Sequence, residues 1–461
     1  MDTQSLQAEL TAKALEHNVP GVAVGVFVDG VEHYAFHGVT SVENPLEVTA
    51  ETLFQFGSTG KTFTATAMMR LVEQGLVSLD DPVRLHVPEL KLQDESVAAE
   101  VTIRQLFNHT AGWDGDFHQD TGLGDDALTK YVELMAGLRQ VTPLGASVSY
   151  NNASLSLAGR VIEKVTGKTF EQAIRDLLLD PLELDMTFFF TDEIMTRRFV
   201  VGHAYKDDTQ TIARPWGLPR NGAPAGGLSA NARDQIKWAK FHLGDGTTAD
   251  GTRLLTRESL DLMKTPTVEC AGNALGDAIG ISWLLAQVDG VTVVKHGGTM
   301  IGQYSDFMTI PEKNFAVISM SNSGPGGPLL NHQICEWAME HFVGVRSIKP
   351  VPVLLPSEEL EAYAGRFETI AAFIVLEPED GRLRARVEYK PETFEMLRAA
   401  GEDPDAEQPA MFLCIQEGNR DRYVGEGDAA AMVGYFDRDE AGAIVGVNLG
   451  GRYATRVPVT V

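Results

Sequence analysis

Residues 53–61 read Leu-Phe-Gln-Phe-Gly-Ser-Thr-Gly-Lys, and this stretch decides how the rest of the chain is interpreted. An apolar, strand-like run ends at Gly57, and the segment that starts at Lys61 has the composition of a helix. Positions i and i+3 of a helix lie on one face. The amine of Lys61 can therefore reach the hydroxyl of Ser58 and, when neutral, accept its proton, as for an activated serine nucleophile. A Ser-x-x-Lys motif also arises by chance. In that case Ser58 is only the N-cap of a helix, so further motifs are needed to identify it as a nucleophile.

Two further motifs follow in the first three quarters of the chain. Tyr150-Asn151-Asn152 opens a segment whose apolar residues recur with helical spacing, and His296-Gly297-Gly298 follows a strand-like run. The structural alternatives are an N-cap at Asn152 and a bulge or tight turn at the glycine pair. Chemically, the Tyr150 phenol can shuttle a proton, and a backbone N–H beside two glycines can face a carbonyl oxygen.

In this order the three motifs resemble those of the serine β-lactamase-like superfamily. That superfamily comprises class C β-lactamases, penicillin-binding DD-peptidases, D-aminopeptidases and related esterases and acyltransferases. Leu-Phe-Asn-His-Thr-Ala-Gly at 106–112 resembles its LLxHTSG helix end, and Gly-Gly-Leu-Ser at 226–229 resembles its GGLxST turn. The resemblance covers about residues 8–343. Residues 358–461 resemble, more weakly, the lipocalin-like domains that some members append.

The resemblance implies an acyl-enzyme mechanism. Ser58 attacks a carbonyl carbon, and Lys61 and Tyr150 share the acid and base roles. No metal or other cofactor is expected, because the sequence has no His/Asp/Glu cluster with metal-ligand spacing. A lysine can act as a base near pH 7 only if burial lowers its pKa from about 10.4. The oxyanion sits between the backbone N–H groups of Ser58 and Thr299, each contributing about 3–4 kcal/mol. The orienting residues implied are Asn152, His296, Gly297 and Gly298.

His296 is the informative departure from the family pattern. β-Lactamases and DD-peptidases usually carry Lys-Thr-Gly there, and that lysine helps to hold a substrate carboxylate. The neighbouring Lys295 cannot replace it, because adjacent strand residues point to opposite faces. We therefore expect hydrolysis of a neutral carboxylic ester or lactone. The alternatives are a D-aminopeptidase or other amidase, an acyltransferase and, less favoured, a β-lactamase or DD-peptidase or a non-catalytic sensor.

Aromatic and sulfur-containing side chains in the loops suggest a bulky, apolar substrate. The alternative is that several of them only pack the loops. The candidate substrate-binding residues are Trp113, Phe117, His118, Trp216, Met300 and Tyr304.

Composition and charge exclude several classes of partner. With 44% hydrophobic and 22% charged residues the chain is typical of a globular protein. A formal net charge of −26 argues against nucleic acids and anionic membranes. The three cysteines show no metal-ligand spacing, and the N-terminus has no signal-peptide pattern, so a cytoplasmic location is expected. The expected partners are a small ester or lactone and, for a dimer, a second copy of the chain.

The order of elements predicts an α+β fold in two domains. Strand-like runs lie at both ends of residues 1–345, with helices between them, so one antiparallel sheet flanked by helices should sit beside a helical subdomain. A proline-rich linker is expected at 346–357, followed by a small β-barrel at 358–461. The expected strands are 21–28, 31–39, 279–286, 292–295, 304–309 and 315–320, then 373–376, 383–388, 411–416 and 444–448 in the barrel; helices are expected at 61–76, 152–165 and 329–342.

Overall fold

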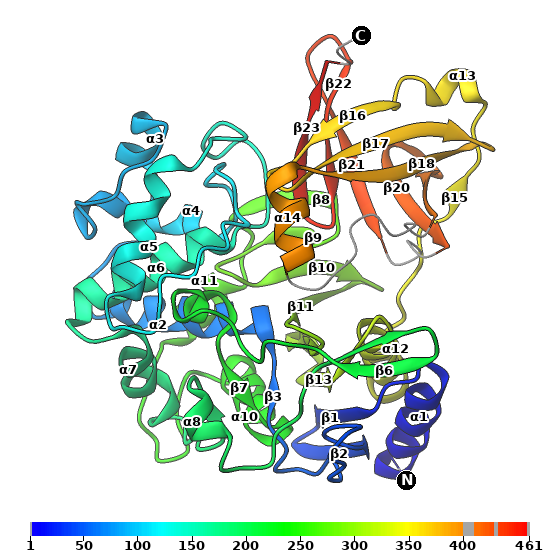
Figure 1. Cartoon of the computed structure of the whole chain (residues 1–461). Coiled ribbons are helices and arrows are strands. Elements are labelled where there is room, and N and C mark those ends of the chain that lie inside the picture. Colours follow the sequence, from blue (N-terminus) through cyan, green and yellow to red (C-terminus); the bar gives the residue numbers. More distant parts are fainter. Residues whose placement is uncertain (1, 400–409, 428–431, 459–461) are drawn as a thin grey trace.

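The computed structural model describes residues 2–399, 410–427 and 432–458. Figure 1 shows two bodies: a helix-and-sheet body that ends with helix α12, and a β-barrel, orange to red, that packs above it. The α+β fold with a second all-β barrel, predicted from the sequence, is confirmed.

An eight-stranded antiparallel sheet forms the centre of the first body. Its strand order is β2-β1-β13-β12-β11-β10-β9-β8, so strands from both ends of this body pair at its middle. Helices α1 and α12 pack on one face, and α10 packs on the other. The strands are β1 (Gly21–Val28), β2 (Val31–Gly38), β8 (Val268–Asn273), β9 (Gly276–Ile279), β10 (Leu284–Val288), β11 (Val291–Thr299), β12 (Tyr304–Ile310) and β13 (Phe315–Ser321); the helices are α1 (Asp2–Glu16), α10 (Ala232–Leu243) and α12 (Gly326–Val343).

The first hairpin follows the sequence closely. All eight residues of β1 are buried because helices cover both faces of the sheet there, which explains its unbroken apolar run. Asp29 and Gly30 both have positive φ, as the two central residues of a tight hairpin turn require.

The predicted strand at 279–286 is instead two strands. The chain turns between β9 and β10, where the backbone of Gly280 packs so tightly that a Cβ would lie 2.1 Å from the Met263 oxygen. Strand β11 runs past the predicted end at 295 through His296-Gly297-Gly298 to Thr299, which pairs with Tyr304. Glycines weaken a strand pattern in sequence, but pairing with β12 holds this segment extended.

The helical subdomain follows the nucleophile segment. Helix α6 begins at Asn152 as predicted, but its N-cap is Asn151, whose side chain accepts a hydrogen bond from the Ser154 N–H. The helices here are α2 (Lys61–Glu73), α3 (Glu95–Glu100), α4 (Ile103–Phe107), α5 (Ala127–Leu134), α6 (Asn152–Thr166), α7 (Phe170–Ile174), α8 (Thr191–Ile194), α9 (Ala223–Gly226) and α11 (Arg257–Met263); short strands are β3 (Phe54–Gln55), β4 (Thr187–Phe188), β5 (His203–Lys206), β6 (Thr209–Ile212), β7 (Ser229–Ala230) and β14 (Ser323–Gly324).

The second body is a closed eight-stranded barrel. Consecutive strands pair antiparallel from β16 to β23, and β16 pairs with β23 to close it around a core that includes Phe367 and Leu413. Part of the expected linker, β15, adds to β19, and α13 follows. The elements are β15 (Pro352–Val353), α13 (Ser357–Leu360), β16 (Gly365–Glu368), β17 (Ala372–Glu379), β18 (Arg382–Tyr389), α14 (Pro391–Ala399), β19 (Met411–Gln416), β20 (Asn419–Gly427), β21 (Val433–Arg438), β22 (Ile444–Leu449) and β23 (Arg452–Val457).

The β22–β23 hairpin of the barrel contacts the first body beside Tyr150. The Tyr150 N–H donates to the Gly451 carbonyl at 2.8 Å, and the Tyr453 N–H donates to Ser149 Oγ at 3.2 Å. The residue between them, Arg452, is thereby held at the Tyr150 motif.

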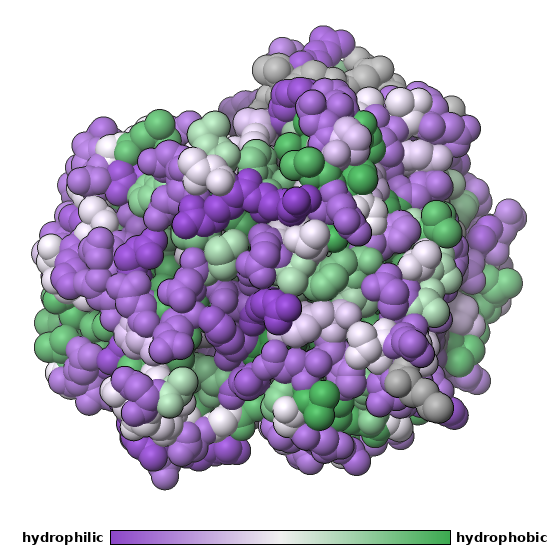
Figure 2. Space-filling model, turned by 90° about the horizontal axis from the view of Figure 1, so that it is seen from below, coloured by the Kyte–Doolittle hydropathy of each residue, from purple (hydrophilic) through white to green (hydrophobic). Residues whose placement is uncertain are grey.

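Figure 2 shows a face dominated by hydrophilic residues, with apolar residues in smaller patches between them. Within the described ranges, no helix is long and apolar enough to cross a bilayer.

Candidate active site

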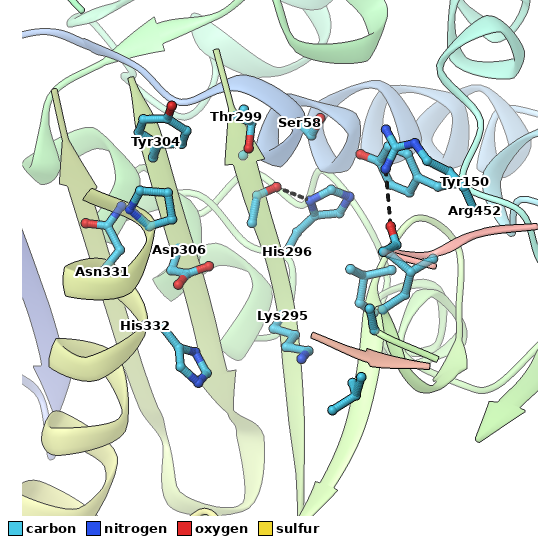
Figure 3. A pocket seen from close by; sticks show the side chains of 18 of the residues that line it. Ser58, Tyr150, Lys295, His296, Thr299, Tyr304, Asp306, Asn331, His332 and Arg452 are labelled. Carbon is cyan, nitrogen blue, oxygen red and sulfur yellow. Dashed lines mark hydrogen bonds between the residues drawn. The ribbon is translucent and has the colours of Figure 1, made fainter. Parts of the chain in front are cut away.

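Ser58 lies in a tight helical turn, η1 (Gly57–Gly60), and not at an ordinary helix cap. Gly57 has φ +53°, and a Cβ on it would lie 2.9 Å from the backbone nitrogen of Thr299. Gly298 is equally constrained, since its Cβ would lie 1.9 Å from the Phe56 oxygen. Glycine at both positions lets the nucleophile turn lie directly against the end of β11, which brings the Ser58 and Thr299 backbones together (Figure 3).

Side-chain hydroxyls fasten this turn to the sheet. Thr59 Oγ1 donates to the His296 carbonyl at 3.1 Å, and Ser305 Oγ donates to the Phe56 carbonyl at 2.8 Å. Helix α2 then starts at Lys61. The turn is thus held at both ends, as an oxyanion site built from backbone N–H groups requires.

Lys61 Nζ lies 3.0 Å from Ser58 Oγ and 2.7 Å from the Ala225 carbonyl oxygen. The side chain is fully buried, and no described carboxylate lies within ion-pair distance of it. Burial holds the Lys61 pKa well below its usual value; the positive charge of Arg452 lowers it further, and the negative charge of Asp116 opposes this. A neutral amine in this position can accept the Ser58 proton.

Tyr150 completes a contact group with Ser58 and Lys61. Its side chain is buried, and Lys61 Nζ lies 4.9 Å from the centre of its ring. Burial raises the pKa of the phenol, while the Ser58 hydroxyl lowers it. The phenol therefore keeps its proton near pH 7 and can donate it to a leaving group.

His296 is neutral in this environment. Its Nδ1 lies 2.7 Å from the Gly297 carbonyl oxygen, which can only accept, so we assign the ring hydrogen to Nδ1. Burial, and then the Lys61 charge, lower the His296 pKa to about 3. The first residue of the His-Gly-Gly motif is therefore uncharged here.

A cation reaches the site from the barrel instead. Arg452 Nε lies 2.6 Å from one Asp116 oxygen and Nη2 lies 3.2 Å from the other, while Asn152 Nδ2 donates to Asp116 at 2.9 Å. The Arg452 guanidinium lies 5.1 Å from the centre of the Tyr150 ring. Neither member of this pair is predictable from the sequence, because the two residues are 336 positions apart and neither stands in a motif.

The candidate substrate residues divide into two groups. Phe117, His118 and Tyr304 line a cavity of about 1360 Å³ that contains Ser58, and Met300 lines an adjoining cavity of about 140 Å³. Trp113 is 1% exposed and belongs to the core, so it lines neither cavity.

Trp216 also lies apart from both cavities. It packs edge-on against Phe199 and donates to the Val200 carbonyl at 3.0 Å. The larger cavity is lined by charged as well as apolar side chains, so its wall is more polar than expected. Over the described ranges no group of three or more His, Cys, Asp or Glu residues could hold a metal ion.

The sequence and the fold both resemble those of known proteins. The Beta-lactamase family model matches residues 5–333, and the chain belongs to this family of serine hydrolases. Penicillin-binding protein 4 of Amycolatopsis lactamdurans is 35% identical over 322 residues, which span 69% of this chain and 84% of that protein.

Some solved structures match nearly the whole chain, barrel included. The crystal structure of SurE superposes with a TM-score of 0.78 at 24% identity and covers 99% of both chains. An octameric penicillin-binding protein homologue from Pyrococcus abyssi superposes with a TM-score of 0.66 at 22% identity, covering 98% of this chain and 99% of that one. At these identities both matches bear on the fold alone.

Proposed function

We propose that the protein hydrolyses carboxylic esters or lactones through an acyl-enzyme on Ser58. The observation that carries this is the 3.0 Å contact between Ser58 Oγ and the buried Lys61 amine, whose lowered pKa makes it a base. Lys61 takes the Ser58 proton as the oxygen attacks, and the backbone N–H groups of Ser58 and Thr299 stabilise the oxyanion. Tyr150 then donates a proton to the leaving group. Water attacks the acyl-enzyme carbonyl and gives a proton to Tyr150, and Lys61 returns its proton to Ser58 Oγ as the ester bond to Ser58 breaks and the acid leaves.

Charge around the nucleophile favours neutral acyl groups. His296 is uncharged, and the Arg452 guanidinium beside Tyr150 is already held by the Asp116 carboxylate. A substrate carboxylate would have to displace Asp116 before Arg452 could bind it. The second candidate is amide hydrolysis or acyl transfer by the same residues. Arg452 would support a substrate of this kind that carries a carboxylate only if the carboxylate displaced Asp116.

A matched pair of substrates decides between ester and amide. A p-nitrophenyl ester and a p-nitroanilide of the same D-amino acid should differ in kcat/KM, with the ester faster. Faster anilide cleavage would reverse the ranking. A burst of p-nitrophenol that stops at one equivalent would instead identify a non-catalytic acyl acceptor.

Light scattering tests the proposed dimer.

The pH dependence of kcat/KM follows from Lys61. Because burial lowers its pKa, the active neutral form exists well below pH 10.5, and activity falls as acidification protonates the amine. We therefore expect an acidic limb that lies far below the pKa of a free lysine. A profile that rises only near pH 10 would contradict a lowered Lys61 pKa.

Replacing Arg452 with methionine should move that acidic limb to higher pH. Removing the guanidinium takes away a positive charge that disfavours protonated Lys61, and it leaves the Asp116 carboxylate to favour it. Both effects raise the Lys61 pKa. Arg420→Met, at an exposed ion pair with Glu359 on the same barrel, should leave the profile unchanged. Identical profiles for Arg452→Met and wild type would show that the barrel charge does not act on Lys61.

A further inference from the structure

The cavity that contains Ser58 continues to a second cluster of charged residues, which the proposed mechanism does not use. We call Lys295, Asp306, Asn331 and the His332–Glu336 pair the annex. All five residues line the same cavity as Ser58. Figure 3 shows that the labelled annex residues come from β11, β12 and α12 and lie away from Ser58 and His296.

Strand pairing explains how the annex forms. Gly297 pairs with Asp306 and Lys295 pairs with Met308, so Lys295 and Asp306 are diagonal neighbours on the sheet face that α12 covers. Gly297 has no side chain, and a Cβ there would lie 3.0 Å from Asp306 Oδ1. The glycine therefore lets the Asp306 carboxylate lie close against β11, in the wall of the cavity that contains Ser58.

Lys295 and Asp306 make no close polar contact through their side chains. Among the described residues, they form no side-chain hydrogen bond and no ion pair within 4.0 Å. Both residues are only partly exposed, and both line the cavity. Partial loss of water raises the Asp306 pKa to about 6 and lowers the Lys295 pKa. A partly desolvated charge without a contact partner gains from a ligand of opposite charge.

Asn331 supplies an independent sign that a ligand belongs here. It is 1% exposed, and its carbonyl oxygen accepts from Ser319 Oγ at 2.8 Å. Its Nδ2 is buried and has no partner within the described part of the chain. An acceptor on a molecule bound in the cavity would satisfy this donor.

We propose that the annex is a subsite for the dipolar end of the substrate, an ammonium group with a neighbouring carboxylate. Asp306 binds the ammonium, and Lys295 with Asn331 binds the carboxylate. The His332–Glu336 pair, 3.3 Å apart, lies at the outer edge and largely neutralises itself. Lys295 lies four residues before Thr299 on β11, which places this end roughly 13 Å from the oxyanion site. This inference rests on the proposed function, because it assigns the remote end of the same substrate.

An alkylboronic acid and its amino-acid derivative test the annex directly. The probes are heptylboronic acid and 2-amino-9-boronononanoic acid, in which seven methylenes join boron to an α-amino acid; both enantiomers are used. The Ser58 oxygen bonds to boron and its proton passes through Lys61 to solvent, which gives a stable tetrahedral adduct. Inhibition constants are measured against p-nitrophenyl ester hydrolysis.

In the wild type the amino-acid end should lower the inhibition constant at least tenfold relative to heptylboronic acid. Asp306→Asn and Lys295→Met should each remove most of that advantage, while heptylboronic acid inhibits both variants within about threefold of wild type. When the amino group of the amino-acid probe is acetylated, Asp306→Asn should no longer change the inhibition constant, whereas Lys295→Met still should. When the carboxylate of the probe is converted to a carboxamide, Lys295→Met should no longer change it, whereas Asp306→Asn still should. Lys313→Met, in the exposed β12–β13 turn, is the control and should change neither constant.

The outcomes separate the two proposals. If heptylboronic acid does not inhibit the wild type, the proposed function fails at Ser58. If heptylboronic acid inhibits but the amino-acid end brings no advantage, or the advantage survives in both variants, the annex proposal is overturned and the proposed function stands.

Discussion

Ser58→Ala should lower kcat for p-nitrophenyl ester hydrolysis by about 10³-fold or more. The variant loses the only oxygen that the proposed mechanism uses to form the acyl-enzyme, whereas the backbone N–H groups of the oxyanion site stay in place. Because η1 is held by Thr59, Ser305 and the Gly57–Thr299 contact, the folded structure should not change.

The control for this prediction is Ser96→Ala, at an exposed position in the first turn of α3. It should keep full activity. Thermal unfolding of both variants shows whether a loss of activity reflects chemistry or folding. Full esterase activity in folded Ser58→Ala would mean that another residue is the nucleophile.

Lys61→Met should lower kcat by a similar order, about 10³-fold, with a modest change in KM. Methionine fills the buried space but cannot accept the Ser58 proton. Lys91→Met, on an exposed loop, should behave as wild type. An effect of Lys61→Met confined to KM would indicate that the lysine binds substrate and is not the base.

The same variant makes a separate prediction about stability. A lysine whose folded pKa is lowered binds fewer protons in the folded than in the unfolded state, so its presence destabilises the fold below the unfolded pKa of about 10.4. As pH rises through the window from the lowered pKa to about 10.4, wild type should gain stability relative to Lys61→Met. Denaturant unfolding of both proteins from pH 6 to pH 10 measures this; parallel curves would contradict it.

Local patterns predicted the parts of the fold that depend on neighbouring residues. The β1–β2 hairpin followed from an apolar run and an Asp-Gly turn, and α6 followed from its apolar spacing and Gly167, which ends it in a left-handed conformation. Strand β11 was too short in the prediction because its last residues include two glycines, and only pairing with β12 keeps them extended.

The candidate site could be predicted where its residues stand in short motifs. Ser58 and Lys61 follow each other within one turn, so their contact is local. The Asp116–Arg452 pair arises from packing of the barrel against the first body, and no sequence spacing encodes it. Trp113 was proposed for the substrate wall because it lies in a loop, but it packs into the hydrophobic core, which has room for its large ring.

Mass spectrometry of acid-quenched enzyme tests most directly whether Ser58 carries an acyl group during turnover. The protein is mixed with a p-nitrophenyl ester, quenched during steady turnover, digested and analysed. We expect one added acyl group on the peptide that contains Ser58, and none in Ser58→Ala. An acyl group on a different residue, or steady turnover with no acylated Ser58 at any quench time, would contradict it.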